Sequence, residues 1–281
     1  LRRLAEANGG GRMIEVWDLQ SGYADICAFV LYEGEETAPR GKLTKEVLGE
    51  TIVITDITRS LPLHVGRGCN PNIGAVEAVQ LIGGFSDPQL TVAVAPNMKE
   101  FLTDSINTAP YFHGAYGPRA HWQYQHLVQK LKNDRDSRQA VITIWDPALD
   151  LVATQPDLPC TVSLHFLIRD NKLVLHTHMR SNDVWWGLAY DVFQFTQLQL
   201  TVARQLGIEA GKYYHHDTSL HIYERDWDKV AALHAPDELM TPLWGFTDFD
   251  TAWKIGHNMK TATALTETEE WYVARLAPYV G

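Results

Sequence analysis

Hydrophobic positions along the chain follow two periods, one typical of helices and one typical of strands. Apolar residues at helical spacing predict helices, which cover residues 23–34, 73–82, 121–132 and 190–206. Runs of β-branched and alternating apolar residues predict strands, which cover residues 51–57, 140–145, 162–168, 172–179 and 215–223. Because strands and helices are mixed without a regular βαβ repeat, the pattern predicts an α+β fold.

Glycines and one turn signal mark where several of these elements end. The helix at residues 73–82 runs into Gly83-Gly84, and the helix at residues 190–206 stops at Gly207; both are typical helix ends. The pair Asp170-Asn171 predicts a turn between two strands. No internal repeat or low-complexity linker divides the chain, so we predict an N-terminal arm at residues 1–20 and a single domain at residues 21–281. After Asp226 few clear periods are visible, and no element is predicted there.

Composition and charge narrow the class of protein. Of the 281 residues 45% are hydrophobic, as in ordinary globular proteins, and no apolar run approaches the ~20 residues of a membrane span. The net charge of −10 argues against a polymeric nucleic acid, because its binding needs a basic surface. A few local arginines are still enough to bind one small phosphate.

The cysteines point to a reducing setting. There are three of them, Cys27, Cys69 and Cys160, far apart and without C-x-x-C spacing. This number and spacing favour neither a disulfide framework nor a zinc site. We therefore predict a cytoplasmic location.

One cysteine and one glutamate are candidates for chemistry. Cys160 follows Pro159 and precedes an apolar strand, and Arg180 comes twenty residues later. An arginine near a thiol stabilises the thiolate, which is the nucleophilic form. Glu77 lies on an apolar helix, where a charged residue rarely stands without a reason. On Cys160 and Arg180 alone, a structural cysteine and a surface arginine is the favoured interpretation.

A group of histidines allows two further interpretations. His215, His216, Asp217 and His221 resemble a metal cluster in composition. Strand alternation places His216 and His221 on opposite faces, so we predict no metal site. A cysteine hydrolase that uses Cys160 and His221 stays open at this point.

The order of motifs from Cys160 to Tyr223 resembles the thymidylate synthase family. The match begins at Pro159-Cys160, continues through an R-S-x-D-x-x-x-G motif from Arg180 to Gly187, and ends at His221-Ile222-Tyr223. Weaker matches extend it upstream, so that it covers roughly residues 23–223: Arg40-Gly41, Glu77, Tyr116-Gly117 and Ser137-Arg138. The resemblance implies a single α+β domain with a mixed β-sheet packed by helices, and a homodimer joined sheet to sheet.

The resemblance also implies a reaction and a role for each matching residue. The family adds a cysteine thiolate to C6 of a pyrimidine nucleotide, and the activated C5 then takes a one-carbon group from 5,10-methylenetetrahydrofolate. The implied roles are Cys160 as nucleophile, with Glu77 and Tyr116 managing protons; Arg40, Arg180, Ser181 and, from the neighbouring subunit, Arg138 at the 5′-phosphate; Asp191 and Gly187 at the base; His221 and Tyr223 at the sugar; and Asp183 and Leu102 at the folate.

The chain departs from the family pattern at three places. Asp191 stands where thymidylate synthases have the asparagine that reads uracil, and an aspartate suits the N3 and N4 atoms of cytosine. Leu102 lies near the place of a tryptophan that packs beside the one-carbon group. The last residues, 277–281, differ from the family's methionine-rich tail. These departures resemble deoxycytidylate hydroxymethylases, in which water completes the reaction.

We therefore expect conversion of dCMP to 5-hydroxymethyl-dCMP. Four alternatives remain open: a CMP 5-hydroxymethylase, a dCMP 5-methyltransferase, a divergent thymidylate synthase and a non-catalytic nucleotide-binding protein. The last is disfavoured because both Cys160 and Glu77 are present.

Overall fold

The computed structural model describes residues 13–64, 66–104, 109–151, 154–233, 239–259 and 264–280. The strands are β1 (Met13–Val16), β2 (Glu35–Thr37), β3 (Thr44–Ile54), β4 (Ala140–Thr143), β5 (Thr161–Arg169), β6 (Lys172–Met179), β7 (Asn182–Asp183) and β8 (Glu209–Tyr223). The α-helices are α1 (Leu19–Glu33), α2 (Pro71–Gly83), α3 (Pro88–Val94), α4 (Tyr116–Asn133), α5 (Pro147–Asp150), α6 (Leu188–Leu206), α7 (Trp227–Ala231), α8 (Phe249–Gly256) and α9 (Glu267–Leu276). Short 3₁₀ turns are η1 (Pro39–Gly41), η2 (Pro96–Phe101) and η3 (Glu224–Asp226).

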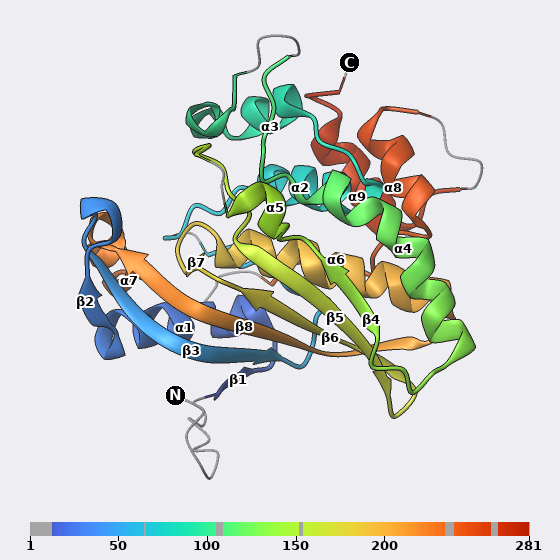
Figure 1. Cartoon of the computed structure of the whole chain (residues 1–281), viewed down its shortest axis with the longest axis horizontal. Coiled ribbons are helices and arrows are strands. Elements are labelled where there is room, and N and C mark those ends of the chain that lie inside the picture. Colours follow the sequence, from blue (N-terminus) through green and yellow to red (C-terminus); the bar gives the residue numbers. More distant parts are fainter. Residues whose placement is uncertain are drawn as a thin grey trace.

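The strands form one mixed sheet in the order β1-β3-β8-β6-β5-β4 (Figure 1). β8 runs antiparallel to β3 and parallel to β6, and the short β7 adds to the end of β8. The β5–β6 hairpin turns at Asp170 and Asn171, which both have positive φ. The predicted α+β class and mixed sheet are therefore confirmed.

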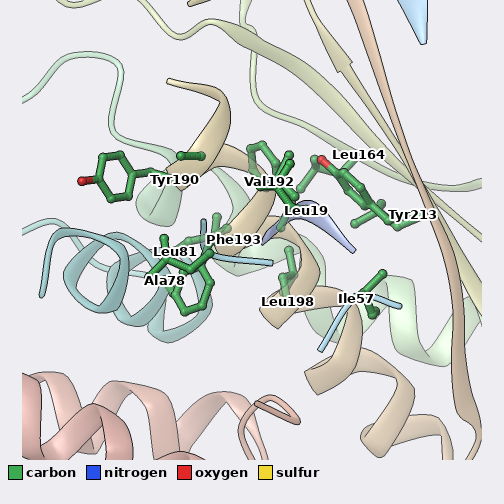
Figure 2. Close-up of a cluster of buried hydrophobic side chains, with 14 of the residues drawn as sticks. Leu19, Ile57, Ala78, Leu81, Leu164, Tyr190, Val192, Phe193, Leu198 and Tyr213 are labelled. Atoms are coloured by element: carbon green, nitrogen blue, oxygen red, sulfur yellow. The ribbon is translucent and has the colours of Figure 1, made fainter. Parts of the chain in front are cut away.

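Helix α6 forms the centre of the molecule, between the sheet and helices α2, α8 and α9 (Figure 1). Val192 faces the sheet residues Leu164 and Tyr213, whereas Phe193 faces Ala78 of α2 (Figure 2). All of these side chains are buried, and each large apolar one contributes about 1.5–3 kcal/mol when it leaves water. The helix ends at Gly207, which adopts the left-handed conformation with φ 66°.

Most of the predicted elements are confirmed, with shifted ends. The four predicted helices correspond to α1, α2, α4 and α6. The strand predicted at residues 51–57 begins earlier, at Thr44, and ends at Ile54. Asp56 ends it early, because its carboxylate accepts from the backbone and hydroxyl of Thr58 in a turn. β8 likewise begins six residues before the predicted start, at Glu209.

The two ends of the chain contain elements that the hydrophobic pattern missed. Residues 13–20 were assigned to an arm, but Met13–Val16 pairs with β3 as strand β1, and α1 begins at Leu19; residues 1–12 lie outside the described residues. Beyond Asp226 the helices are short, so their periods are weak. Helix α9 nevertheless carries a sequence signal, the capping box of Thr266 and Glu269.

One face of the sheet carries a group of half-buried aromatic and imidazole side chains that no helix of the described residues covers. His176 stacks on Tyr214 with ring centroids 4.3 Å apart, and His216 stacks on His178 at 4.7 Å. Burial, followed by the neighbouring histidines, lowers the pKa of His176 and His216 to about 4. These imidazoles are therefore neutral at pH 7.

No helix within the described ranges is long and apolar enough to cross a membrane.

Candidate active site

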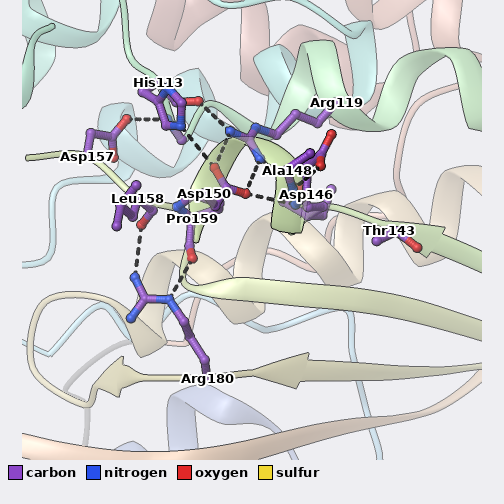
Figure 3. A network of polar contacts seen from close by, with 12 residues as sticks. His113, Arg119, Thr143, Asp146, Ala148, Asp150, Asp157, Leu158, Pro159 and Arg180 are labelled. Atoms are coloured by element: carbon purple, nitrogen blue, oxygen red, sulfur yellow. Dashed lines mark hydrogen bonds and ion pairs between the residues drawn. The ribbon is translucent and has the colours of Figure 1, made fainter. Parts of the chain in front are cut away.

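A short loop positions Cys160 directly before β5. The Arg180 guanidinium donates to the carbonyl oxygens of Pro159 (2.9 Å) and Leu158 (3.2 Å), and the Arg180 amide donates to the Cys160 carbonyl (2.9 Å). Further back, the Asp157 carboxylate accepts from the Gly114 amide at 2.7 Å. The loop is therefore attached at both ends to other elements (Figure 3).

A buried ion pair between Arg119 and Asp150 stabilises the segment that precedes this loop. Arg119 of α4 donates two bonds to Asp150, at 2.7 and 2.9 Å, and a third to the His113 carbonyl oxygen. His113 contacts the same carboxylate at 2.9 Å (Figure 3). Burial raises the pKa of Asp150, but the bonds from Arg119 and the Asp146 amide outweigh it and lower the pKa overall. The network therefore contains an ionised carboxylate, and it fixes the segment that leads to Cys160.

The thiol of Cys160 is protonated in the free protein. Burial raises its pKa to about 11, and the charges of Asp191 and Asp157 add to this. Arg180 and Arg40 oppose the rise, as the sequence suggested for Arg180, but burial is the larger effect. Formation of the thiolate therefore requires a change that comes with the ligand.

Asp191 is the one residue between Leu188 and Ala203 on α6 that is not buried. Its two oxygens accept from different amides at 3.3 Å, Oδ2 from Asn182 and Oδ1 from Gln194. Burial away from bulk water raises the pKa of Asp191 to about 7, despite a lowering by His215. Asp191 is therefore a titratable carboxyl that keeps partial contact with solvent.

Glu77 and Tyr116 lie within electrostatic range of Asp191. Burial and then the Asp191 charge raise the pKa of Glu77 to about 8, and the same two causes raise the pKa of Tyr116 well above its ordinary value. Asp191 also raises the pKa of Cys160. Four predicted site residues from α2, α4, α6 and the start of β5 therefore share one electrostatic environment.

The predicted phosphate residues lie in two places. Arg40 is exposed on η1, with φ 55°, and its charge acts on Cys160; Ser181 directly follows Arg180. Arg138 lies elsewhere, because Ala140 pairs with Phe166, six residues along β5 from Cys160. At about 3.3 Å per residue, Phe166 lies roughly 20 Å along the strand from Cys160. Arg138 therefore lies far from the Cys160 of its own chain.

The remaining predicted residues lie near the end of β8, with one exception. His221 is buried, and its Nδ1 has no partner among the described residues; its ring meets Tyr223 edge-on. Asp183 pairs with His221 across β7 and β8, and its Oδ1 accepts from the amides of Trp185 and Trp186. Leu102 follows η2, and no contact of the described residues connects it with this group.

Gly187 lies at the start of α6, beside the polar groups of Asn182 and Asp191. A Cβ at this position would lie 3.0 Å from Asn182 Oδ1 and 3.2 Å from Asp191 Oδ2. Any side chain would therefore press on the Asp191 carboxyl, which gives this glycine a steric role.

Sequence reasoning missed three residues that surround Asp191: Asn182, Gln194 and His215. Gln194 follows Asp191 by three positions, so helical spacing could have indicated a shared face. His215 was considered only as a metal ligand. In the described residues no group of three or more histidine, cysteine or acidic side chains could hold a metal ion.

A buried thiol, two carboxyls of raised pKa and nearby arginines share this region, and such perturbed groups are typical of functional sites. Over residues 21–243 the sequence matches the thymidylate synthase family. The chain therefore belongs to this family.

Three relatives illustrate the range of similar proteins. The deoxyuridylate hydroxymethyltransferase of Bacillus phage SP01 is 32% identical over 222 residues, which cover 73% of this chain and 57% of that protein. The protein of the same name from Pseudomonas phage M6 is 32% identical, with 73% and 58% covered. The putative thymidylate synthase of Methanothermobacter thermautotrophicus (strain Delta H) is 28% identical over 222 residues, 75% of this chain and 93% of that protein. The chain thus spans little more than half the length of the two phage relatives.

Proposed function

We propose that the chain hydroxymethylates a cytosine nucleotide at C5, converting dCMP, methylenetetrahydrofolate and water to 5-hydroxymethyl-dCMP and tetrahydrofolate. The observation that carries this proposal is Asp191, the one residue of α6 between Leu188 and Ala203 that is partly exposed. The site residues are the same set that the family resemblance implies.

Cys160 is the proposed nucleophile. Its sulfur forms a bond to C6 of the base, and the electron pair of the C5–C6 double bond moves to C5, which becomes nucleophilic. At the end of the cycle the sulfur leaves C6 and the double bond reforms. Methylenetetrahydrofolate supplies the one-carbon unit, and water supplies the hydroxyl oxygen. Glu77, with a pKa of about 8, is protonated at neutral pH and can exchange protons with ordered water.

Asp191 is the proposed reader of the base. A neutral carboxyl donates to N3 of cytosine and accepts from its N4 amino group. Its pKa of about 7 makes the proton available near neutral pH. If the proton transfers to N3, the carboxylate accepts from both atoms in a charge-assisted pair, which is stronger than a neutral one.

A second candidate is hydroxymethylation of dUMP. The two phage relatives are named deoxyuridylate hydroxymethyltransferases. A neutral Asp191 also suits uracil, since it can donate to O4 and accept from N3–H. The two bases differ in one respect: the shared proton can move onto N3 of cytosine, whereas with uracil it stays on Asp191.

Other residues fit the rest of the two ligands. Arg40, Arg180 and Ser181 are proposed to bind the 5′-phosphate, for which guanidinium groups suit well. The unpaired Nδ1 of the buried His221 is available to the sugar 3′-hydroxyl, beside Tyr223.

The folate would lie near Asp183. Both bonds that this carboxylate accepts use Oδ1, so its second oxygen suits the N–H donors of a pterin ring. Leu102, in the place of the family's tryptophan, supports entry of water and hence a hydroxymethyl product.

A homodimer joined through the open sheet face is part of the proposal. That face carries His176, Tyr214 and His216 half-buried and without a helix from the described residues. The roughly 20 Å between Arg138 and Cys160 along the strand supports the donation of Arg138 to the neighbouring subunit.

Product analysis tests this function. The chain is incubated with methylenetetrahydrofolate and dCMP, CMP or dUMP, and the nucleotide mass is measured, with Cys160→Ser as control. We expect a gain of 30 mass units, about one CH₂O, from dCMP, with tetrahydrofolate as the other product. A gain of about 14 with stoichiometric dihydrofolate would instead identify a methyltransferase. Modification of dUMP alone would favour the second candidate.

A further inference from the structure

A row of contacting polar side chains connects the strand β8 to Asp191. From β8, Asp217 contacts His215 Nε2 at 3.3 Å, and the same nitrogen lies 2.9 Å from Asn182 Nδ2. Asn182 then donates to Asp191 Oδ2, and Gln194 Nε2 lies between Asp191 Oδ1 and Glu77 Oε2 at 3.3 and 3.4 Å. Asp217, His215, Asn182 and Gln194 are all buried, so these contacts are shielded from water.

His215 fixes the direction of the Asn182 amide. In the contact at 2.9 Å the amide donates, so Nε2 of His215 accepts and the imidazole proton lies on Nδ1, 2.7 Å from the Tyr213 hydroxyl. With the amide in this direction, Asn182 Oδ1 is buried without a partner in the described part of the chain. A buried acceptor without a partner lowers the stability of the fold. We therefore infer that the hydrogen bonds donated by Asn182 Nδ2 offset this loss.

We propose that Asn182, oriented by His215, is a positioning residue that holds Asp191 as an acceptor and thereby favours cytosine over uracil. The proposal rests on the proposed function in one respect, namely that Asp191 reads a pyrimidine base. With Gln194 on the other oxygen, both oxygens of Asp191 face an amide donor, and donors favour the ionised carboxylate.

The preference follows from where the shared proton can lie. In a cytosine complex the proton can lie on N3, so Asp191 keeps both amide bonds as a carboxylate. In a uracil complex the proton must stay on one oxygen of Asp191, which makes that oxygen a weaker acceptor for its amide. Both complexes bind the same number of protons, so the ratio of the two affinities is independent of pH.

Other titratable groups lie around Asp191. Glu77 of α2, Tyr116 of α4, Cys160 and Asp217 share the site, and all of their charged forms are negative, so they favour a neutral Asp191. His215 of β8 acts in the opposite direction only when it is protonated, whereas the tautomer that orients Asn182 is neutral. The two amides are therefore the neutral groups that lower the pKa of Asp191.

The test measures binding and does not depend on catalysis. The dissociation constants of dCMP and dUMP are measured by titration calorimetry from pH 6 to 9, for the full wild-type chain and for Asn182→Ala. Loss of the amide should lower the preference for dCMP about tenfold, the value of one hydrogen bond to a charged group. The pH above which both nucleotides bind more weakly should rise by about one unit.

Two further variants separate positioning from damage. Gln197→Met removes a buried amide from the same helix, away from Asp191, and should leave the ratio unchanged. His215→Phe leaves Asn182 in place but removes its orientation, and should lower the ratio in the same direction as Asn182→Ala.

An unchanged ratio in a folded Asn182→Ala variant, or an equal change in Gln197→Met, would overturn the proposal. The ratio of the two dissociation constants in the wild type tests the proposed function separately. A preference for dUMP would refute cytosine as the base, while the change of this ratio in Asn182→Ala would still test the role of the Asn182 amide. If the wild-type chain binds neither nucleotide, both proposals fail.

Discussion

The substitution Asp191→Asn tests base choice most directly. It keeps the size of the side chain and removes its titratable proton. The amide can donate to O4 of uracil and accept from N3–H without any proton uptake. With cytosine it can form only neutral hydrogen bonds, because no proton can be shared with N3.

The structure sets the size of both effects. At pH 8 a pKa of about 7 leaves roughly one Asp191 in ten protonated. Both complexes contain this proton, so wild-type turnover of either nucleotide is reduced about tenfold, and the asparagine variant should regain this factor with both. For dCMP the gain is offset by the change from a charge-assisted to a neutral hydrogen bond, which costs about 1–1.5 kcal/mol, about tenfold. The ratio of kcat/KM values should therefore shift by about tenfold toward dUMP.

The assay measures kcat/KM for dCMP and dUMP with the wild type and Asp191→Asn between pH 7 and 9. The gain on dUMP is required, since a loss on dCMP alone would also follow from a damaged site. Thermal unfolding and sedimentation show whether the variant remains folded and keeps its oligomeric state. If the ratio stays constant in a folded variant, Asp191 does not choose the base, and the assignment of cytosine loses its main support.

Three further outcomes are expected. Glu77→Gln should stabilise the chain increasingly as pH rises from 5 to 8, because a pKa raised to about 8 makes the wild type lose stability over this range, by at most about 5 kcal/mol; a gain that does not depend on pH in urea titrations would contradict this. Asp150→Ala should cost about 3–5 kcal/mol of unfolding free energy, since it removes the only carboxylate that pairs with the largely buried Arg119 among the described residues, and equal urea midpoints would refute the structural role of the network. Arg138→Ala and Cys160→Ala should each be inactive but regain activity when re-associated, and no recovery in a verified heterodimer would argue against a shared site.

The sequence predicted those parts of the fold where one hydrophobic period extends over many residues. The helix at 190–206 and the strand at 172–179 correspond to α6 and β6, because both are long or strictly alternating. The first half of β3 was missed, since Lys45, Glu46 and Gly49 interrupt its apolar pattern. Such residues are tolerated there because only one face of the strand is buried.

The site was predicted through the motif order, and its electrostatics were not. Spacing could indicate that Cys160 lies near Arg180, but it could not indicate that burial would outweigh the arginine and raise the thiol pKa. Likewise Asn182 and His215 are 33 positions apart in sequence and meet only through the pairing of β6, β7 and β8. Contacts of this kind depend on sheet register, which no local pattern contains.

The protonated state of Cys160 has a consequence for the survival of the protein between catalytic cycles. Oxidants and electrophiles react with thiolates, and each step of oxidation beyond sulfenic acid is hard to reverse. With a pKa of about 11, only about one Cys160 in ten thousand is a thiolate at pH 7. As the proposed nucleophile, a thiol in this state is thereby protected against peroxide and other electrophiles until a ligand changes its surroundings.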